Sequence, residues 1–180
     1  MKLLIASDIH GAADACARLM RAVEEENPDR IVLLGDLLYH GPRNELPPDY
    51  NPKLVIQMLN HHTHSIIAVR GNCEAEVDQM VLSFPCMDTS NTLYDPSCDH
   101  TLFFTHGHVY GPGLHNSIDN QPPLAPGDAL VYGHTHIKVH EQSATQAGVT
   151  YFNPGSVGIP KDGSASYGIY VEGRFEHRIL

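Results

Sequence analysis

The amino-acid sequence predicts an α/β fold in which two β-sheets pack face to face and helices lie on the outside. Two observations favour this class. Strand and helix patterns alternate in the first part of the chain, whereas short strands dominate from Thr101 onward. A chain of 180 residues is long enough to bury a stable core without disulfide support. We therefore expect a single domain spanning residues 1–180.

The first half of the chain has the pattern of a parallel sheet with crossover helices. Residues 3–7 form an apolar run typical of a buried strand, and residues 12–26 place apolar side chains at helical spacing on one face. A second apolar run follows at residues 31–34. A helix near residues 53–61 then returns the chain to a third strand at residues 66–69. This β-α-β-α-β order predicts three parallel strands.

The second half of the chain has a different pattern, because short β-rich runs follow one another with turn residues between them. We expect these strands to build a second sheet whose connections are mainly hairpins. The expected strands are residues 101–105, 129–132, 138–142, 150–152, 167–171 and 175–179.

Five of the expected strands end in residues that can bind a metal ion. In an open α/β sheet the loops beyond the carboxyl ends of neighbouring strands face one crevice, so ligands far apart in the sequence can meet there. The candidates are Asp8 and His10 after the first strand, Asp36 after the second, Asn72 after the third, His106 after residues 102–105, and His134 and His136 after residues 130–132.

The chemistry of these side chains indicates a pair of metal ions. Imidazole and carboxylate ligands without thiolates suit Mn, Fe, Zn or related transition ions. Four histidines, two aspartates and one asparagine are too many for one ordinary site, whereas two ions that share a carboxylate would use them all. Asp36, alone at its strand end, is the expected bridge. Such a site would retain positive charge and attract an anionic phosphoester.

The composition argues against some classes of binding partner and indicates a cellular compartment. The formal net charge is −10 and no basic tract is present, which opposes binding of a long nucleic acid. No apolar run approaches the length of a membrane span, and the N-terminus lacks the pattern of a secretory signal. Four cysteines without a C-x-x-C pair favour reduced thiols. We expect a cytoplasmic protein.

Each motif has a simpler interpretation when it is taken alone. An Asp-x-His sequence after a strand is often a helix cap with a surface histidine, and the Gly35-Asp36 and Gly71-Asn72 pairs are common turns. The Gly-His-Thr-His sequence at residues 133–136 is more specific, although a polar strand end is an alternative. The metal-site interpretation therefore depends on the joint pattern at five strand ends.

Taken together, these motifs resemble the calcineurin-like metallophosphoesterases in order and spacing, over nearly the whole chain. Within that superfamily four further stretches are similar to the small bacterial YfcE-type phosphodiesterases. The stretches that carry the resemblance are Asp8-x-His10, Gly35-Asp36, Gly71-Asn72, His106-Gly107 and residues 133–136, together with residues 35–44, 69–73, 77–80 and 152–157.

The resemblance implies a four-layer α/β/β/α sandwich, a dinuclear metal site and phosphodiesterase activity with a metal-bridging hydroxide as the nucleophile. The expected cofactor is a pair of divalent ions, with Mn²⁺ favoured and Fe, Zn, Co or Ni as alternatives. The resemblance also implies two ligand sets. The first ion would be held by Asp8, His10, Asp36 and His136, and the second by Asp36, Asn72, His106 and His134.

The residue after Gly71-Asn72 departs from many relatives, which carry a histidine there and use it near the leaving group. This chain has Cys73. A thiol is a weaker proton donor, so we expect either a preference for esters with acidic leaving groups or recruitment of a nearby histidine such as His108. Arg43, in the proline-rich loop 39–48, and Arg70 are candidates to bind the substrate phosphate.

Three functions compete at this point. The first is hydrolysis of a small phosphodiester, supported by the complete ligand set. The second is a phosphomonoesterase or protein phosphatase with the same metals, and the third is a non-catalytic metal-bound interaction scaffold. A nucleotide-binding module is disfavoured because neither G-x-G-x-x-G nor G-x-x-x-x-G-K-[ST] is present. The preferred partner is a small molecule, and a homo-oligomer is left open.

Overall fold

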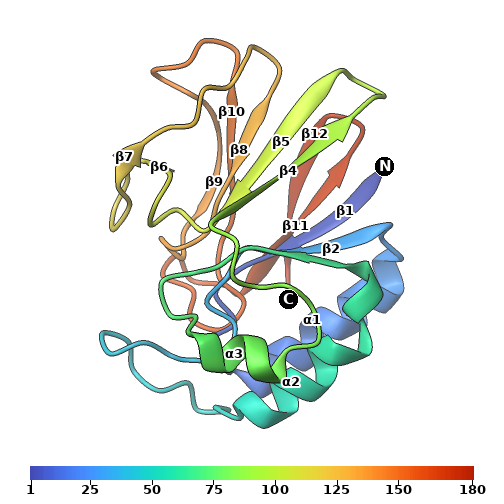
Figure 1. The fold of residues 1–180 in the computed structure, drawn as a ribbon, viewed down its shortest axis with the longest axis vertical. Helices are drawn as coiled ribbons and strands as arrows, with labels where there is room; N and C mark the ends of the chain where they lie inside the picture. The colour runs from blue at the N-terminus through green and yellow to red at the C-terminus, as the bar shows by residue number, and fades with distance from the viewer.

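The computed structural model describes all residues, 1–180, and consists of two five-stranded sheets packed face to face with helices on one side (Figure 1). A third, two-stranded ribbon is formed by β6 (Gly111–Pro112) and β7 (Asp119–Asn120). No helix is long and apolar enough to cross a bilayer.

The first sheet carries the parallel strands that begin the chain. β1 pairs in parallel with β2, and β2 pairs in parallel with β3, as the alternating pattern predicts. Two antiparallel strands extend the other edge of the sheet. The strand order is β12 (Arg174–Ile179), β11 (Ser166–Val171), β1 (Lys2–Ala6), β2 (Arg30–Leu33) and β3 (Ile66–Ala68).

The second sheet is also mixed. Its three inner strands run parallel to one another, and each edge strand is joined to its neighbour as an antiparallel pair. The strand order is β4 (Ser90–Asp95), β5 (His100–Thr105), β8 (Ala129–Val131), β10 (Thr150–Pro154) and β9 (Lys138–Gln142).

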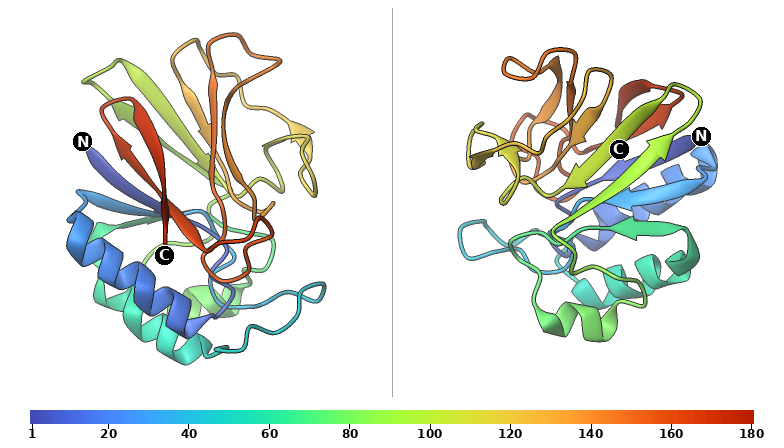
Figure 2. Two further views of the ribbon diagram at one scale, coloured as in Figure 1. Left: turned by 180° about the vertical axis from the view of Figure 1, so that it is seen from behind. Right: turned by 45° about the horizontal axis from the view of Figure 1, so that its top comes forward.

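All the helices lie on the outer side of the first sheet, as the view from behind also shows (Figure 2). α1 (Ala13–Glu26) buries the stripe that contains Leu19 and Val23, and it ends at Asn27 in the left-handed conformation. The other helical segments are α2 (Pro52–His61), η1 (Thr63–Ser65) and α3 (Glu76–Val81).

The alternation of side chains along β1 explains why the two sheets pack together. Leu4 points to the cluster under the helices, whereas Leu3 and Ile5 point to the cluster between the sheets. There they join Phe104 of β5 and Phe152 of β10. Because β1 is buried on both faces, it fixes the position of the residues that follow it.

The expected α/β sandwich of two mixed sheets is confirmed, with two differences in its parts. The prediction placed residues 167–171 and 175–179 in the second sheet, and this is wrong: as β11 and β12 they complete the first sheet beside β1. The outer face of the second sheet is also covered without a helix. Leu124, from the proline- and glycine-rich segment 106–128, packs there on Leu130 and Tyr132.

Candidate metal centre

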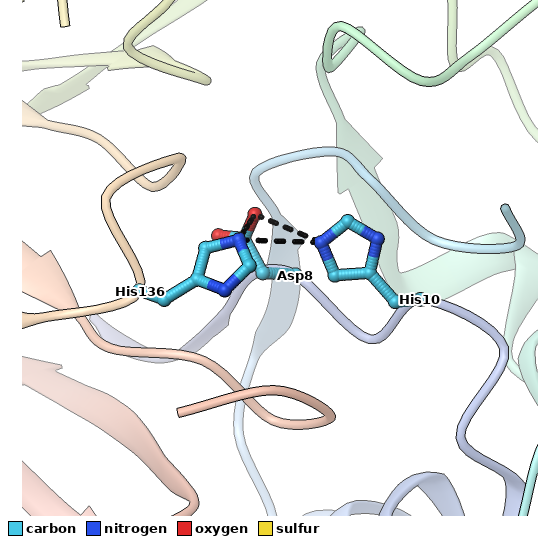
Figure 3. A group of neighbouring side chains, drawn as sticks. All are labelled: Asp8, His10 and His136. Atoms are coloured by element: carbon cyan, nitrogen blue, oxygen red, sulfur yellow. Dashed lines mark hydrogen bonds and ion pairs between the residues drawn. The ribbon is translucent and has the colours of Figure 1, made fainter. Parts of the chain in front are cut away.

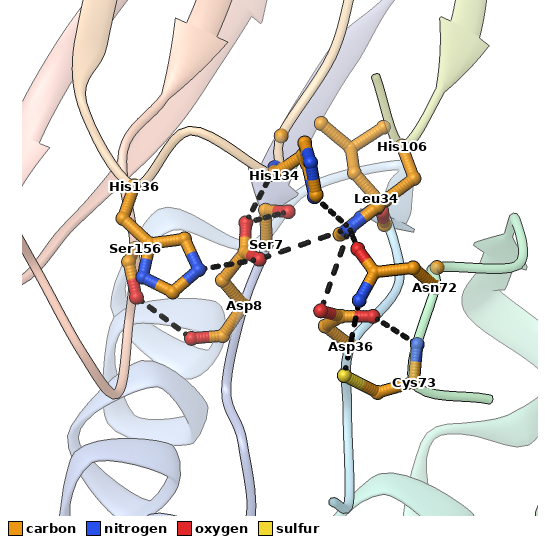
Figure 4. A network of polar contacts seen from close by, with 12 residues as sticks. Ser7, Asp8, Leu34, Asp36, Asn72, Cys73, His106, His134, His136 and Ser156 are labelled. Atoms are coloured by element: carbon orange, nitrogen blue, oxygen red, sulfur yellow. Dashed lines mark hydrogen bonds and ion pairs between the residues drawn. The ribbon is translucent and has the colours of Figure 1, made fainter. Parts of the chain in front are cut away.

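The five strand ends named above meet at one edge of the two sheets (Figure 4). Three of them follow β1, β2 and β3 of the first sheet, and two follow β5 and β8 of the second. The site therefore lies across the junction of the sheets. Six of its seven side chains are buried, namely Asp8, His10, Asp36, His106, His134 and His136, whereas Asn72 is exposed.

Left-handed backbone is concentrated at these strand ends. Nine residues other than glycine have positive φ, and five of them belong to the predicted metal site. For a residue with a Cβ this conformation is strained by an order of 1–3 kcal/mol, and such strain clusters at functional sites. The five residues are Asp8 (φ 57°), His10 (φ 52°), Asp36 (φ 55°), His134 (φ 66°) and His136 (φ 62°).

Two glycines let the turns after β2 and β3 approach each other. A Cβ on Gly71 would lie 2.1 Å from Oδ1 of Asp36, and one on Gly35 would lie 2.4 Å from the backbone nitrogen of Gly71. Neither distance is sterically possible without movement. The Gly-Asp and Gly-Asn pairs thus have a physical role beyond turn formation, because they bring Asp36 and Asn72 into one site.

One group of potential ligands consists of Asp8, His10 and His136 (Figure 3). Oδ1 of Asp8 lies 3.1 Å from Nε2 of His136 and 3.6 Å from Nε2 of His10. The two Nε2 atoms are 3.3 Å apart. These three atoms lie close together beyond the carboxyl ends of β1 and β8.

A second group surrounds His106. Its Nε2 lies 3.5 Å from Oδ2 of Asp36, 3.1 Å from Oδ1 of Asn72 and 3.2 Å from Nδ1 of His134. Asp36 also reaches the first group, because the same Oδ2 atom lies 3.7 Å from Nε2 of His10. Asp36 thus stands between the two groups.

The outer ring nitrogen of each histidine contacts a backbone carbonyl oxygen. An N–H must donate there, so in the neutral ring the other nitrogen presents a lone pair to the site. The four contacts are His10 Nδ1 to Tyr39 O (2.7 Å), His106 Nδ1 to Leu34 O (2.6 Å), His136 Nδ1 to Ile159 O (2.7 Å) and His134 Nε2 to Asn116 O.

This arrangement fits a bound cation. The inward lone pairs of His10 and His136 face each other and the carboxylate of Asp8, which is repulsive unless positive charge lies among them. Oδ1 of Asp8 is also buried without a hydrogen-bond partner, whereas Oδ2 accepts bonds from Ser7 Oγ and the backbone N–H of His134. An orphaned carboxylate oxygen among imidazole nitrogens is a suitable ligand set for a transition ion.

In the metal-free protein, protons supply the positive charge. Burial alone would raise the pKa of Asp36, but the His106 imidazolium outweighs it and lowers the pKa to about 2. Burial disfavours a charged His106, yet Asp36 and Asp8 raise its pKa to about 10. Burial and the neighbouring His106 lower the pKa of His134 to about 4. A metal ion and the His106 proton would therefore compete for one position.

Glu74 is a buried residue that sequence reasoning missed. Its Oε2 accepts hydrogen bonds from the backbone N–H groups of Asp36 (2.8 Å) and Gly71 (2.5 Å), and its Oε1 accepts one from Leu37 (2.7 Å). Glu74 thereby ties the turn after β2 to the turn after β3. The available signal in the sequence was the position of Glu74 directly after Gly71-Asn72-Cys73. No apolar pattern there predicts that this carboxylate is buried.

The Asn153-Pro154-Gly155-Ser156 turn supports the opposite side of the site. Nδ2 of Asn153 donates to the Gly133 carbonyl (2.8 Å) and to Oγ1 of Thr135 (3.0 Å), which holds the Gly-His-Thr-His turn. Oγ of Ser156 donates to the Asp8 carbonyl (2.8 Å). This turn therefore positions the segments that carry Asp8, His134 and His136.

A pocket of about 250 Å³ opens above the metal-binding groups, and no hydrophobic residue lines it. Arg43 lies at this pocket, whereas Arg70 does not and instead donates from Nη2 to the Glu74 carbonyl (3.2 Å). Sequence reasoning missed Lys161. The lining residues are Asp36, Arg43, Asn44, Asn72, Asn116, His134, His136 and Lys161.

The two proton-donor candidates differ in their surroundings. Cys73 lies beside Asp36, whose Oδ1 accepts its backbone N–H (2.8 Å), and Nδ2 of Asn72 donates to its Sγ (3.2 Å). Burial and then Asp36 raise the pKa of this thiol well above its usual value. The ring of His108 lies edge-on to that of His106, and burial followed by that neighbour lowers the pKa of His108 to about 4. His108 does not line the pocket.

The sequence matches known proteins over most of its length. The model of the calcineurin-like phosphoesterase superfamily domain matches residues 1–172. Phosphodiesterase YfcE of Escherichia coli strain K12 is 47% identical over 171 residues, which cover 94% of this chain and 86% of that protein.

Solved structures agree with the sequence matches. The structure of YfcE, a phosphoesterase from E. coli, superposes with a TM-score of 0.86 at 47% identity and covers 94% of this chain and 87% of that one. An archaeal phosphodiesterase has the same fold, with a TM-score of 0.67 at 21% identity over 100% of both chains. From the family match and the fold, this chain belongs to the calcineurin-like phosphoesterase superfamily.

Proposed function

We propose that this protein is a metal-dependent phosphodiesterase that hydrolyses a small phosphodiester at the site formed by the five strand ends. The observation that carries the proposal is the position of Asp36. Its Oδ2 lies 3.7 Å from Nε2 of His10 and 3.5 Å from Nε2 of His106, so one carboxylate contacts both groups of ligands. A carboxylate between two sets of nitrogen donors is placed to bridge a pair of ions.

In the proposed site the two ions have separate ligand sets that share Asp36. When bound, two divalent ions would lower the pKa of a shared water and neutralise charge on the phosphate. We assign the first ion to Asp8, His10, Asp36 and His136, and the second to Asp36, Asn72, His106 and His134. Mn²⁺ is the proposed ion because of the resemblance to the metallophosphoesterases, and the nitrogen and oxygen donors are compatible with it.

The remaining tasks belong to the side chains of the chain itself. The carbonyls of Tyr39 and Ile159 hold His10 and His136 in the orientation that directs Nε2 inward. Arg43, at the pocket, is placed to donate hydrogen bonds to an anionic group of the bound ester. Catalysis would thus depend on orientation of the ester and on electrostatic stabilisation in a site whose donors are already positioned.

The 47% identity to a protein named a phosphodiesterase supports diesters over monoesters as substrates. To test this, the protein would be stripped with a chelator and reloaded with Mn, Fe, Zn, Co or Ni separately. Hydrolysis of bis(4-nitrophenyl) phosphate would then be compared with hydrolysis of 4-nitrophenyl phosphate. We expect no turnover without metal, the highest turnover with Mn²⁺, and a preference for the diester.

Two variants test whether the bound ions act in catalysis. Asp36→Asn removes the charge between the two groups and His134→Ala removes an imidazole, so each should lower kcat/KM by about a hundredfold or more. Asp14→Asn and His64→Ala are matched controls, because both side chains are exposed and lie outside the site. Full turnover by the first two variants would show that ions held by these residues do not act in catalysis, whereas metal binding by the wild type without turnover would favour a non-catalytic scaffold.

A further inference from the structure

The pocket above the metal-binding groups contains more positive charge than a single phosphodiester needs. Four lining residues are assigned as metal ligands, and the other four are Arg43, Asn44, Asn116 and Lys161. The two cations are notable in a chain whose formal net charge is −10. Neither Arg43 nor Lys161 forms an ion pair within the protein, although Lys2, Lys138 and Arg178 do.

Lys161 is held at the site by its own backbone. Its N–H donates to the carbonyl of His136 (3.1 Å), and the carbonyl of Ile159, two residues earlier, accepts from Nδ1 of the same histidine (2.7 Å). The adjacent carboxylate does not neutralise Lys161, because Asp162 pairs with Nζ of Lys138 at 2.7 Å. The ammonium group of Lys161 therefore remains available to a ligand.

Arg43 reaches the same pocket from the proline-rich loop. The carbonyl of Tyr39, four residues earlier, accepts from Nδ1 of His10 (2.7 Å), and Nδ2 of Asn44 closes the loop on the His40 carbonyl (2.8 Å). Arg43 and Lys161 thus extend from the two segments that orient His10 and His136. Both cations are tied to the half of the site that contains Asp8.

The charge of the pocket indicates what it would accept. With two divalent ions, two aspartates and a hydroxide the site carries about +1, which the single charge of a diester balances. Arg43 and Lys161 then have no anion to bind. Because no hydrophobic residue lines the pocket, an aromatic or aliphatic ester group would also find no apolar surface there.

We propose that Arg43 and Lys161 form a second anion site, and that the substrate is a small hydrophilic phosphodiester with a further carboxylate or phosphate on one ester group. This inference rests on the proposed phosphodiesterase function. It adds to that function a substrate class and two residues that determine specificity.

The test compares two diesters that differ in one charge. Carboxymethyl 4-nitrophenyl phosphate carries a carboxylate, and 2-methoxyethyl 4-nitrophenyl phosphate has a neutral group of similar size without a hydroxyl that could attack the phosphorus. We expect the Mn²⁺-loaded protein to favour the first by about tenfold in kcat/KM, through KM, with the ratio falling at high salt. In Arg43→Gln/Lys161→Gln the ratio should approach one, whereas Lys53→Gln, at an exposed position on α2, should keep it.

Binding of unreactive probes separates this inference from the proposed function. Phosphonoacetate should bind the Mn²⁺-loaded protein about tenfold more tightly than propylphosphonate, and the double variant should lose the difference. A binding preference without diester turnover would support the anion site and contradict the proposed function. Turnover of both diesters without a preference would overturn the anion site, as would an equal loss on both substrates in the double variant.

Discussion

The carboxylate of Glu74 accepts a hydrogen bond from the backbone N–H of Asp36 at 2.8 Å, although the two residues are 38 positions apart. Together with its bonds to Gly71 and Leu37, this contact gives each oxygen of Glu74 at least one N–H donor. Burial, and then the charge of Asp36, raise the pKa of Glu74. The energetic cost of burying the Glu74 carboxylate is offset by these hydrogen bonds. They join the turns after β2 and β3, which carry the candidate ligands Asp36 and Asn72.

Glu74→Gln should destabilise the protein, because an amide NH₂ would face a backbone N–H that now has a carboxylate acceptor. A hydrogen bond to a charged group contributes roughly 1.5–3 kcal/mol, so we expect a loss of about 2 kcal/mol in the free energy of unfolding. Urea denaturation of the chelator-treated protein measures it. Glu45→Gln, at an exposed site without an ion pair, is the control and should change stability by less than about 0.5 kcal/mol.

The strand ends could be predicted because their pattern is local. Apolar runs such as residues 31–34 are long enough to identify a buried strand, and the Gly-Asp that follows needs no distant contact to be recognised as a turn. The helix at residues 12–26 was likewise evident from its stripe and is observed as Ala13–Glu26. The expected cytoplasmic location and the metal identity stay predictions.

Features set by distant contacts could not be predicted in the same way. The sequence of β11 and β12 predicts a hairpin but does not indicate which sheet the hairpin joins. Its place beside β1 depends on the burial of Ile169 and Tyr170 on opposite faces of β11. β4 was missed because only Asp95 among its residues is buried, so it has no apolar run. The function of Glu74 depends on turns that meet only after folding. Arg70 is adjacent to a ligand turn in the sequence, yet its side chain binds a carbonyl away from the pocket.

The stability of the metal-free protein should fall as pH rises above about 6.5. The pKa of His106 is raised from 6.5 to about 10, so the folded state keeps a proton that the unfolded chain releases. Its stabilising contribution is complete below pH 6.5 and is lost as pH rises toward 10. The pKa of Asp36 is lowered from 3.8 to about 2, so its contribution is lost as pH falls through that range.

Thermal unfolding between pH 6 and pH 10, with chelator present, measures the His106 effect. His106→Gln should flatten the alkaline decline, whereas His64→Gln, which alters an exposed histidine, should not. An unchanged slope in His106→Gln would show that another group is responsible. The stability of the Mn²⁺-loaded protein should fall less as the pH rises, because loss of the His106 proton favours metal binding.

Asn153→Leu should weaken metal binding more than it weakens the fold. The side chain is buried, and its Nδ2 donates to the Gly133 carbonyl and to Oγ1 of Thr135, so it orients the turn that carries His134 and His136. Loss of such a supporting contact typically costs tenfold to a hundredfold in metal affinity. Titration of the stripped protein with Mn²⁺ measures this change.

A matched control for Asn153→Leu is Asn60→Leu. Asn60 also uses its side chain to hold backbone, through Nδ2 to the Val81 carbonyl (2.9 Å) and Oδ1 to the Ser83 N–H (2.8 Å), but it lies on α2 away from the site. The Asn60→Leu variant should have a lower free energy of unfolding and an unchanged affinity for Mn²⁺. If both variants bind Mn²⁺ equally well, the Asn153 contacts serve the fold alone.

Cys73→His should improve turnover of esters with poor leaving groups. In the wild type, burial and the nearby carboxylate of Asp36 raise the pKa of the thiol, which makes it a weak proton donor at neutral pH. An imidazole at the same position could protonate a leaving alkoxide, and general-acid catalysis typically contributes about a hundredfold or more. The measurement is kcat/KM for a series of aryl phosphodiesters with leaving groups of increasing pKa.

The shape of that series distinguishes the explanations. The wild type should lose activity steeply as the leaving group becomes more basic, and Cys73→His should make the dependence shallower while changing the most acidic leaving group little. Cys98→Ser is the control for loss of a cysteine, because Sγ of Cys98 lies far from the site, 3.5 Å from the hydroxyl oxygen of Tyr170.

His108→Ala tests the alternative proton donor. Because the pKa of His108 is lowered to about 4, this ring is neutral at pH 7 and its removal should leave the slope unchanged.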